Sequence, residues 1–282
     1  MLWPPRPGIT VKHVLNACTK WLAKQGWDEA FRGRLPELME TQERYRAAAE
    51  TGQLLALLIS EVGAQSVDPD KGRLNATYDR AFVGGGGRKL YDAIKAAAIH
   101  GSCTVCGVGE ASTLDHHAPK DSFPLLALTP LNLVPACGPC NQGKSKNFST
   151  VAAEEPFHPY FDDLGAVRWL YADVCRVAGG GAVEFSVRPP ADWSKIKAER
   201  LFHHFTRHKL GKKYGYVASR RLATRRRKDT RLLESSGTEV LRATLIEDAD
   251  SCAVVDPNDW ETALLYALAD SDWYINGGMK EI

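Results

Sequence analysis

The sequence predicts a mostly helical α+β protein with a small metal-stabilised module near its middle. Apolar residues recur at helical spacing over residues 11–62 and alternate like a strand over residues 182–187. Two Cys-x-x-Cys pairs stand 30 residues apart near the centre of the chain. The 282 residues are 44% hydrophobic and 25% charged, which is ordinary globular composition and excludes a mainly disordered, collagen-like or coiled-coil protein.

Residues 1–94 form the first expected part, a helical region. The apolar spacing predicts a helix from Val11 that ends at Gly26, and a second helix from Pro36, in its first turn, to Glu61. This region has no catalytic signature, so we interpret it as a surface for a partner or for a homo-oligomer.

Residues 63–88 are predicted to be loop-like. They include four consecutive glycines, Gly84 to Gly87, without the Lys-Ser/Thr ending of a phosphate-binding loop. We therefore expect a flexible turn there, because glycine adopts many backbone conformations. A helix over 89–99 follows and leads into the first cysteine pair.

The central module spans residues 95–165 and the C-terminal α+β region spans residues 166–282. The elements expected in the C-terminal region, from composition and periodicity, are a helix or strand over 167–177, a turn at Gly179–Gly181, a strand over Ala182–Val187, helices over Trp193–Lys209 and 216–235, a strand over Leu241–Ile246 and a helix over Trp260–Leu268.

The net charge of +2 hides two opposite blocks. Residues 195–231 hold 14 basic and 2 acidic residues, net +12, whereas residues 232–282 hold 2 and 11, net −9. Clustered Lys and Arg neutralise phosphates, so we expect DNA binding by the basic block. The alternatives are a solvated helix face and a surface paired with the acidic end. The candidate nucleic-acid-binding residues are Lys212, Lys213, Arg220, Arg221, Arg225, Arg226, Arg227 and Lys228.

The seven cysteines divide into four metal-ligand candidates and three bystanders. Cys103, Cys106, Cys137 and Cys140 form the two pairs, and four thiolates complete the closed tetrahedral shell of a structural Zn²⁺ site. The N-terminus lacks a secretory signal, which favours metal over disulfides. We expect Cys18, Cys175 and Cys252 to be core or boundary thiols.

Three short segments inside and after this cysteine frame carry a resemblance. They are Leu114-Asp115-His116-His117, Asn132-Leu133-Val134-Pro135, and Cys140-Asn141-Gln142-Gly143-Lys144. Over residues 100–148 the chain resembles the HNH endonucleases, in particular the zinc-stabilised members with a ββα-metal core. The resemblance implies a D-H…N…N variant of that core embedded in a mostly helical chain.

The resemblance also implies a role for each matched residue. Asp115 and Asn141 would bind the catalytic divalent ion, Mg²⁺ or Mn²⁺, and His116 would activate water as general base. Asn132 would steady the loop and the histidine, and Lys144 would face the phosphate or cap the helix. The chemistry is coherent by itself, since an imidazole titrates near neutral pH and hard oxygen ligands suit Mg²⁺.

Two neighbouring features are ambiguous in the sequence. His117 follows His116 directly, and because successive strand side chains alternate faces we favour His116 as the base. His158 and Asp162 lie just after the module and fit either support for the active site or a turn with a buried aromatic.

We therefore expect a metal-dependent endonuclease that hydrolyses DNA in the cytoplasm. The embedding suggests a phage-defence or mobile-element setting with an ATPase or sensor partner. No run approaches 18 apolar residues, so no membrane span is expected. The alternatives are a non-catalytic zinc module that binds nucleic acid or protein, and an RNA-cleaving nuclease.

Overall fold

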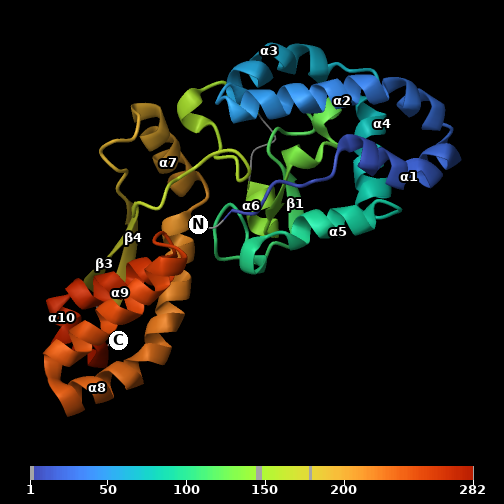
Figure 1. The fold of residues 1–282 in the computed structure, drawn as a ribbon. Coiled ribbons are helices and arrows are strands. Elements are labelled where there is room, and N and C mark those ends of the chain that lie inside the picture. The colour runs from blue at the N-terminus through green and yellow to red at the C-terminus, as the bar shows by residue number, and fades with distance from the viewer. Residues whose placement is uncertain (1–2, 144–147, 178–179, 282) are drawn as a thin grey trace. The chain divides into compact units, whose positions relative to one another are not determined.

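A computed structural model describes residues 3–143, 148–177 and 180–281. The chain folds into two compact units, Leu2–Asp162 and Asp163–Ile282 (Figure 1). The expected helical region and the expected module therefore share one unit. Within the described residues, no helix has the length and apolar character needed to cross a membrane.

The first unit is helical apart from one small hairpin. In chain order its elements are α1 (Val11–Gln25), α2 (Asp28–Glu50), α3 (Leu54–Ser66), α4 (Lys71–Ala76), a π-helical segment (Thr77–Phe82), α5 (Arg88–Ala96), β1 (Thr113–His116), β2 (Leu133–Ala136) and α6 (Gly138–Gly143). Short 3-10 turns occupy Ile99–Gly101, Pro124–Leu126, Pro130–Asn132 and Ala152–Glu154.

Helix α1 forms where the apolar spacing predicts it. Its chain reverses at Gly26, which adopts φ 69° and donates its backbone N–H to the carbonyl of Ala23. Left-handed backbone of this kind favours glycine because glycine has no Cβ. Cys18 lies on the buried face of α1, and burial raises the pKa of its thiol to about 12. It is therefore a protonated core side chain, as expected.

Helix α2 differs from the prediction. It begins at Asp28, so Pro36 lies inside it rather than in its first turn, and it ends at Glu50 instead of continuing to Glu61. The buried side chains Phe31, Leu38 and Tyr45 recur every seven residues along one face. This continuous packed face extends across the proline, which explains why a local helix breaker did not set the boundary.

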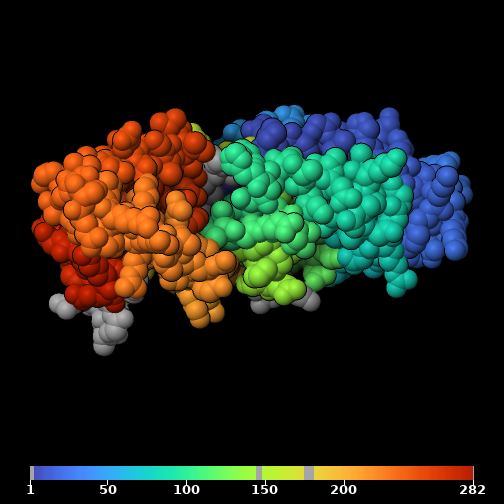
Figure 2. All heavy atoms as spheres, turned by 90° about the horizontal axis from the view of Figure 1, so that it is seen from below, coloured from blue at the N-terminus to red at the C-terminus, as the bar shows by residue number. Residues whose placement is uncertain are grey.

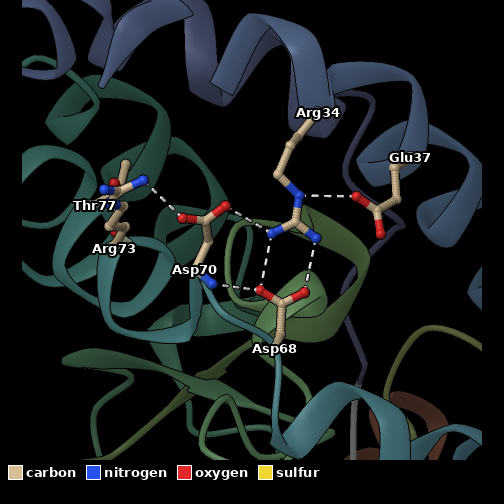
Figure 3. A network of polar contacts seen from close by, with 6 residues as sticks. All are labelled: Arg34, Glu37, Asp68, Asp70, Arg73 and Thr77. Atoms are coloured by element: carbon tan, nitrogen blue, oxygen red, sulfur yellow. Dashed lines mark hydrogen bonds and ion pairs between the residues drawn. The ribbon is translucent and has the colours of Figure 1, made fainter. Parts of the chain in front are cut away.

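The prediction of a loop over 63–88 was also wrong in most of its length, because α3, α4 and the π-helical segment fill much of it. The link between α3 and α4 is held by an ionic network around Arg34 of α2 (Figure 3). The guanidinium of Arg34 contacts both carboxylate oxygens of Asp68, at 2.8 and 2.7 Å, and also Asp70 at 3.1 Å. The hydrogen bond from Arg34 lowers the pKa of Asp68, which keeps this carboxylate charged.

The glycine run is a turn, as predicted, but a closely packed one. A Cβ on Gly86 would lie 2.4 Å from the carbonyl oxygen of Ala17 in α1, and one on Gly87 would overlap Phe82. Here glycine is needed because the backbone approaches its neighbours, and not because the segment must bend freely.

The hairpin of β1 and β2 and its connecting loop contribute to two clusters of buried side chains. The strands pair antiparallel with Asp115 opposite Val134 and His116 opposite Leu133. One cluster joins α1, the π-helical segment and α5 to Leu114 and Leu133 of the hairpin. The other joins α2 and α3 to the loop that links the two strands. The first cluster therefore holds the strands, and both clusters hold the loop.

The second unit pairs another hairpin with long helices. Its elements are β3 (Leu170–Val177), β4 (Gly180–Val187), α7 (Lys195–Arg207), α8 (Leu210–Val255), α9 (Trp260–Asp270), α10 (Asp272–Ile275) and a 3-10 turn (Gly278–Glu281). The strands pair antiparallel, α9 packs on β3 and α8 packs on β4 (Figure 1). The predicted strand over 182–187 and the predicted helices near α7 and α9 are confirmed. Part of the turn predicted at Gly179–Gly181 lies outside the described residues.

The strand predicted at Leu241–Ile246 was wrong, because these residues belong to α8. Leu241, Leu245 and Ala249 are buried at four-residue spacing, which is the periodicity of one helix face. Two helical halves meet at Gly237, where φ is 81° and ψ is 179°, and the 2.9 Å contact between Arg225 and Asp248 shows that the second half folds back beside the first. A short apolar run fits a strand or a buried helix face equally well, and packing against α9 decided between them.

Candidate functional site

The four paired cysteines meet at one point in the first unit. Cys103, Cys106, Cys137 and Cys140 are all buried, and their sulfur atoms lie within 4.8 Å of one another. Two of these atoms, Sγ of Cys106 and Sγ of Cys137, are 3.9 Å apart. Tetrahedral zinc–thiolate bonds of about 2.3 Å place sulfur atoms about 3.8 Å apart. The four cysteines could therefore hold a metal ion such as zinc.

The chemistry of the donors agrees with this geometry. Hydrogen bonds from the Cys103 and Cys140 thiols hold the pKa of Cys106 well below its usual range, so a negative charge is favoured within the cluster. A thiolate is the form that binds a metal ion.

The local backbone explains why the two cysteine pairs come together. Gly107 adopts φ 70° in the first turn, and the backbone N–H of Cys103 donates to Gly109 at 2.7 Å. A Cβ on Gly109 would lie 2.9 Å from Cβ of Cys137, so glycine allows the two turns to touch. Thr104 completes the contact by donating its hydroxyl and its backbone N–H to the carbonyl of Pro135 in β2.

The second cysteine pair joins β2 to the short helix α6. Cys137 follows β2, Cys140 lies within α6, and Asn141 comes next. The Asn141 amide Nδ2 donates to the Thr113 hydroxyl at 3.1 Å and to the Leu114 carbonyl at 3.4 Å. Because alternate side chains share a strand face, Thr113 and Asp115 lie on one face of β1. Asn141 therefore lies beside the face of β1 that carries Asp115.

His116 ends β1 and is buried, with 8% of its surface exposed. Its Nε2 lies 2.9 Å from the carbonyl oxygen of Ala127, and its ring meets that of Tyr78 edge-on with centroids 4.4 Å apart. A carbonyl oxygen can only accept, so Nε2 carries the proton and donates it. In the neutral ring the lone pair is then on Nδ1, which is the atom able to take a proton.

Asn132 immediately precedes β2 and is fully buried. Its Oδ1 accepts the backbone N–H of Ala118 at 2.7 Å, and its Nδ2 donates to the carbonyls of Ala118 and Leu126. One amide side chain thus ties together the start, the middle and the end of the loop between β1 and β2. This loop also carries the Ala127 carbonyl that orients His116.

A polar chain from outside the hairpin reaches Asn132. The hydroxyl of Tyr45, on α2, lies 3.2 Å from Oδ1 of Asn132 and 3.0 Å from Nε2 of His158. His158 Nδ1 accepts the backbone N–H of Tyr160, so its Nε2–H donates to Tyr45 and Tyr45 donates to Asn132. The His158 ring also packs on the ring of His117, and the two ring centroids are 4.2 Å apart. His116 and His117 therefore pack against different neighbours.

The sequence contained only part of this arrangement. Two interpretations were open for the segment that holds His158 and Asp162: support for the active site, or a turn with a buried aromatic. In the structure His158 hydrogen-bonds to Tyr45, and Asp162 accepts the backbone N–H of His158 at 2.7 Å in the turn that follows. Tyr45 lies 87 residues from Asn132, and nothing in its Ala-rich surroundings separates it from an ordinary core tyrosine. Tyr78 likewise has no local signal. Lys144 falls outside the described residues.

The basic candidates of the second unit divide into two groups. Arg225 is buried, with its guanidinium 3.0 Å from Asp229 and 2.9 Å from Asp248, so it is a structural residue and not a surface contact for DNA. Arg221 pairs with Glu261 at 2.6 Å and Lys228 lies 3.6 Å from Asp248. The acidic end therefore neutralises part of the basic block, which was one of the alternatives. Lys212, Arg220 and Arg227 are exposed.

Comparisons with known proteins add one relative. The chain is similar to the protein ea31 of Escherichia phage lambda, with 26% identity over 307 aligned positions that cover 97% of this chain and 98% of ea31. No family model matches the chain. No solved structure matches it either. The name ea31 states no activity, so the chemistry of the site has to carry the functional argument.

Proposed function

We propose that the chain is a metal-dependent endonuclease of the HNH type that hydrolyses DNA phosphodiester bonds. The observation that carries the proposal is the arrangement around β1. Asp115 and His116 are adjacent on this strand, and Asn141 contacts it from the short helix that follows β2. A histidine and hard oxygen donors at neighbouring positions of a hairpin followed by a helix are the residue types that metal-assisted phosphodiester hydrolysis uses.

His116 is the proposed general base. Its Nε2–H is held by the Ala127 carbonyl, which fixes the ring, and Nδ1 is the ring atom that would take a proton from water. Asn132 is a positioning residue in this proposal, because it holds the loop that carries Ala127.

We propose two ions with different tasks. The four buried thiols form a closed set and would hold a structural zinc ion, which ties the segment before β1 to the start of α6. The Asp115 carboxylate and the Asn141 amide oxygen would hold Mg²⁺ or Mn²⁺, which supplies positive charge to the scissile phosphate. Among the atoms of Asn141, Nδ2 is directed to β1, so Oδ1 is the atom suited to this task.

The setting is part of the proposal. A relative encoded by a phage favours the mobile-element side of the expected context. An ATPase or sensor partner, or a homo-oligomer, would then bring the nuclease to its substrate. The proposed location is the cytoplasm, where the DNA substrate is found.

The test compares cleavage by the wild-type chain with that by His116→Ala and His117→Ala. Supercoiled plasmid and labelled RNA are incubated with each protein and Mg²⁺ or Mn²⁺, and zinc content and melting temperature are measured to verify folding. We expect His116→Ala to lower the rate of DNA cleavage by about 10²–10⁴-fold, the usual contribution of a general base. His117→Ala should retain more activity, because His117 packs on His158 instead of facing Ala127.

Three results would contradict the proposal. Unchanged cleavage by His116→Ala would remove His116 as the base. Absence of cleavage by the wild type with either ion would favour a non-catalytic zinc module. Cleavage of RNA but not of DNA would make the chain an RNA-cleaving nuclease instead.

A further inference from the structure

The basic half of α8 carries two kinds of cationic side chain, distinguished by the side of the helix on which they lie. The buried face of this segment is formed by Tyr214, Ala218, Leu222, Arg225 and Asp229. At 100° per residue, these positions define the side of the helix that packs on the rest of the unit. Apart from the half-buried Lys213, every other basic residue of this segment is exposed and either borders this face or lies opposite to it.

The cations that border the buried face are already engaged. Arg221 pairs with Glu261 of α9, Lys228 lies near Asp248, and Arg226 donates to the carbonyl of Lys280 at 2.7 Å. The contacts to Glu261 and Lys280 hold the C-terminal segments against α8, and the contact to Asp248 joins the two halves of α8. Their positive charge is therefore largely used within the unit.

The side opposite the buried face carries a second set, which we name the outer stripe. It consists of Lys212, Tyr216, Arg220, Arg227 and Arg231. These positions are spaced by four, four, seven and four residues, so they fall within about 100° of arc on a regular helix. Between its first and last members the stripe extends for roughly 28 Å at 1.5 Å per residue.

The outer stripe is free to meet a ligand. All five side chains are exposed, and Tyr216 has 67% of its surface exposed, the largest value among the exposed aromatics of the unit. Within the described parts of the chain, none of its four cations forms an ion pair. Orange atoms from this part of the chain can be seen at the surface in the space-filling view (Figure 2).

We propose that the outer stripe binds the phosphate backbone of duplex DNA, and this inference rests on the proposed nuclease function. A row of exposed cations along one side of a helix suits the closely spaced phosphates of a duplex, and binding would release counterions from those phosphates. The Tyr216 hydroxyl adds a donor of the kind that contacts phosphate oxygens. The contacts are to backbone, so they position the DNA without reading its sequence.

Other polyanions fit the stripe less well. An anionic membrane would attract the cations, but an amphipathic helix also inserts an apolar face into the lipid, and the apolar face of α8 is packed on β4 and α9. An acidic protein partner requires a buried apolar centre, whereas Tyr216 is the only large apolar side chain in the stripe. DNA is therefore the occupant that we propose.

The experiment compares two triple variants with the same change in charge. Arg220→Ala, Arg227→Ala and Arg231→Ala remove stripe cations, and Arg221→Ala, Arg226→Ala and Lys228→Ala remove bordering ones. Both sets are made in the full chain with His116→Ala, and binding to a labelled 30-base-pair duplex is followed by fluorescence anisotropy at several salt concentrations without added Mg²⁺. Poly-glutamate and anionic vesicles are used as competitors.

We expect the stripe variant to weaken DNA binding at least about tenfold near physiological salt and to lower the slope of log K against log salt by about three. The bordering variant should keep most of the affinity but melt at a lower temperature, since its contacts are internal. The inference would be overturned if the two variants lost the same affinity for DNA, or if the stripe variant bound DNA as tightly as the wild-type stripe does. It would also be overturned if poly-glutamate or vesicles displaced the labelled duplex as well as unlabelled duplex does.

This assay is independent of cleavage. If DNA binds through the stripe and the wild-type chain cleaves no DNA, the stripe stands and the proposed nuclease activity fails. If the chain cleaves DNA and both triple variants bind equally, the nuclease stands and the stripe fails.

Discussion

At the scale of single residues, Tyr45 shows how a distant side chain can hold a local motif in place. Its hydroxyl joins Asn132, which fixes the loop between β1 and β2, to His158, which stacks on His117. Tyr45, Asn132 and His158 are all buried, so both hydrogen bonds are made where water cannot replace them. Removing the hydroxyl takes away the acceptor of the His158 Nε2–H, whereas Asn132 Oδ1 still accepts the backbone N–H of Ala118.

We predict that Tyr45→Phe lowers the free energy of unfolding by about 1–3 kcal/mol, the cost of leaving a buried donor unsatisfied. Urea unfolding followed by fluorescence measures this value. Tyr216→Phe is the matched control, because Tyr216 is exposed and its hydroxyl is accessible to water, and it should change stability little. Equal effects of the two substitutions would show that the polar chain does not contribute to stability.

The same pair of variants tests a dependence on pH. Burial raises the pKa of Tyr45 well above its usual value of 10.0. Above pH 10 the unfolded chain therefore binds fewer protons than the folded chain, and the free energy of unfolding falls as the pH rises. Tyr45→Phe should make this fall shallower by up to about one proton. Tyr78 and Tyr160 shift in the same direction, so some dependence should remain.

At the scale of elements, close approach of the backbone matters as much as helical propensity. The turn at Gly84–Gly87 brings the backbone of Gly86 against the carbonyl of Ala17, so α1 and the start of α5 are fixed by the absence of a side chain. Helix propensity alone would predict that every glycine lowers the stability of the chain. The surroundings of each glycine separate the required ones from the replaceable ones.

We predict opposite effects for alanine at two glycines. Gly86→Ala should destabilise the chain by about 1–3 kcal/mol, because its Cβ would overlap the Ala17 carbonyl oxygen and the backbone must shift. Gly72→Ala, in α4 with no atom within 4 Å of the added Cβ, should stabilise it by about 0.5–1 kcal/mol. Denaturant unfolding distinguishes these signs, and a stabilising Gly86→Ala would refute the packing argument.

At the scale of the whole molecule, the two units depend on different internal links. The unit Leu2–Asp162 contains the four-cysteine cluster, and the unit Asp163–Ile282 contains the buried pair of Arg225 and Asp229, which also accepts the hydroxyl of Tyr274 at 2.7 Å. A buried carboxylate that loses its cation is left uncompensated, at a cost of about 3–5 kcal/mol.

We predict two thermal transitions that respond to different perturbations. Calorimetry of the full chain in the presence of a strong zinc chelator should lower the transition of the first unit only, because a structural metal contributes directly to folding. Arg225→Ala should lower the other transition only. A single transition, or a shift of the same transition by both treatments, would contradict the independence of the two units.

The sequence by itself determined the features whose signal is local. The two Cys-x-x-Cys pairs indicated a metal-binding cluster, and the four thiols do converge. The spacing of apolar residues predicted α1 and α9, and the alternation of residues 182–187 predicted β4. Each of these patterns is read within a few neighbouring residues, so no knowledge of distant contacts is needed.

Only the tertiary structure decided what depends on distant partners. It extended α2 through Pro36, turned the expected strand at Leu241–Ile246 into helix, and joined Tyr45 to Asn132. It also divided the basic block, since Arg225 is buried against carboxylates whereas Arg220 and Arg227 lie on the opposite side of the same helix. Local charge and propensity are the same on both sides of a helix, and packing alone determines which side faces water.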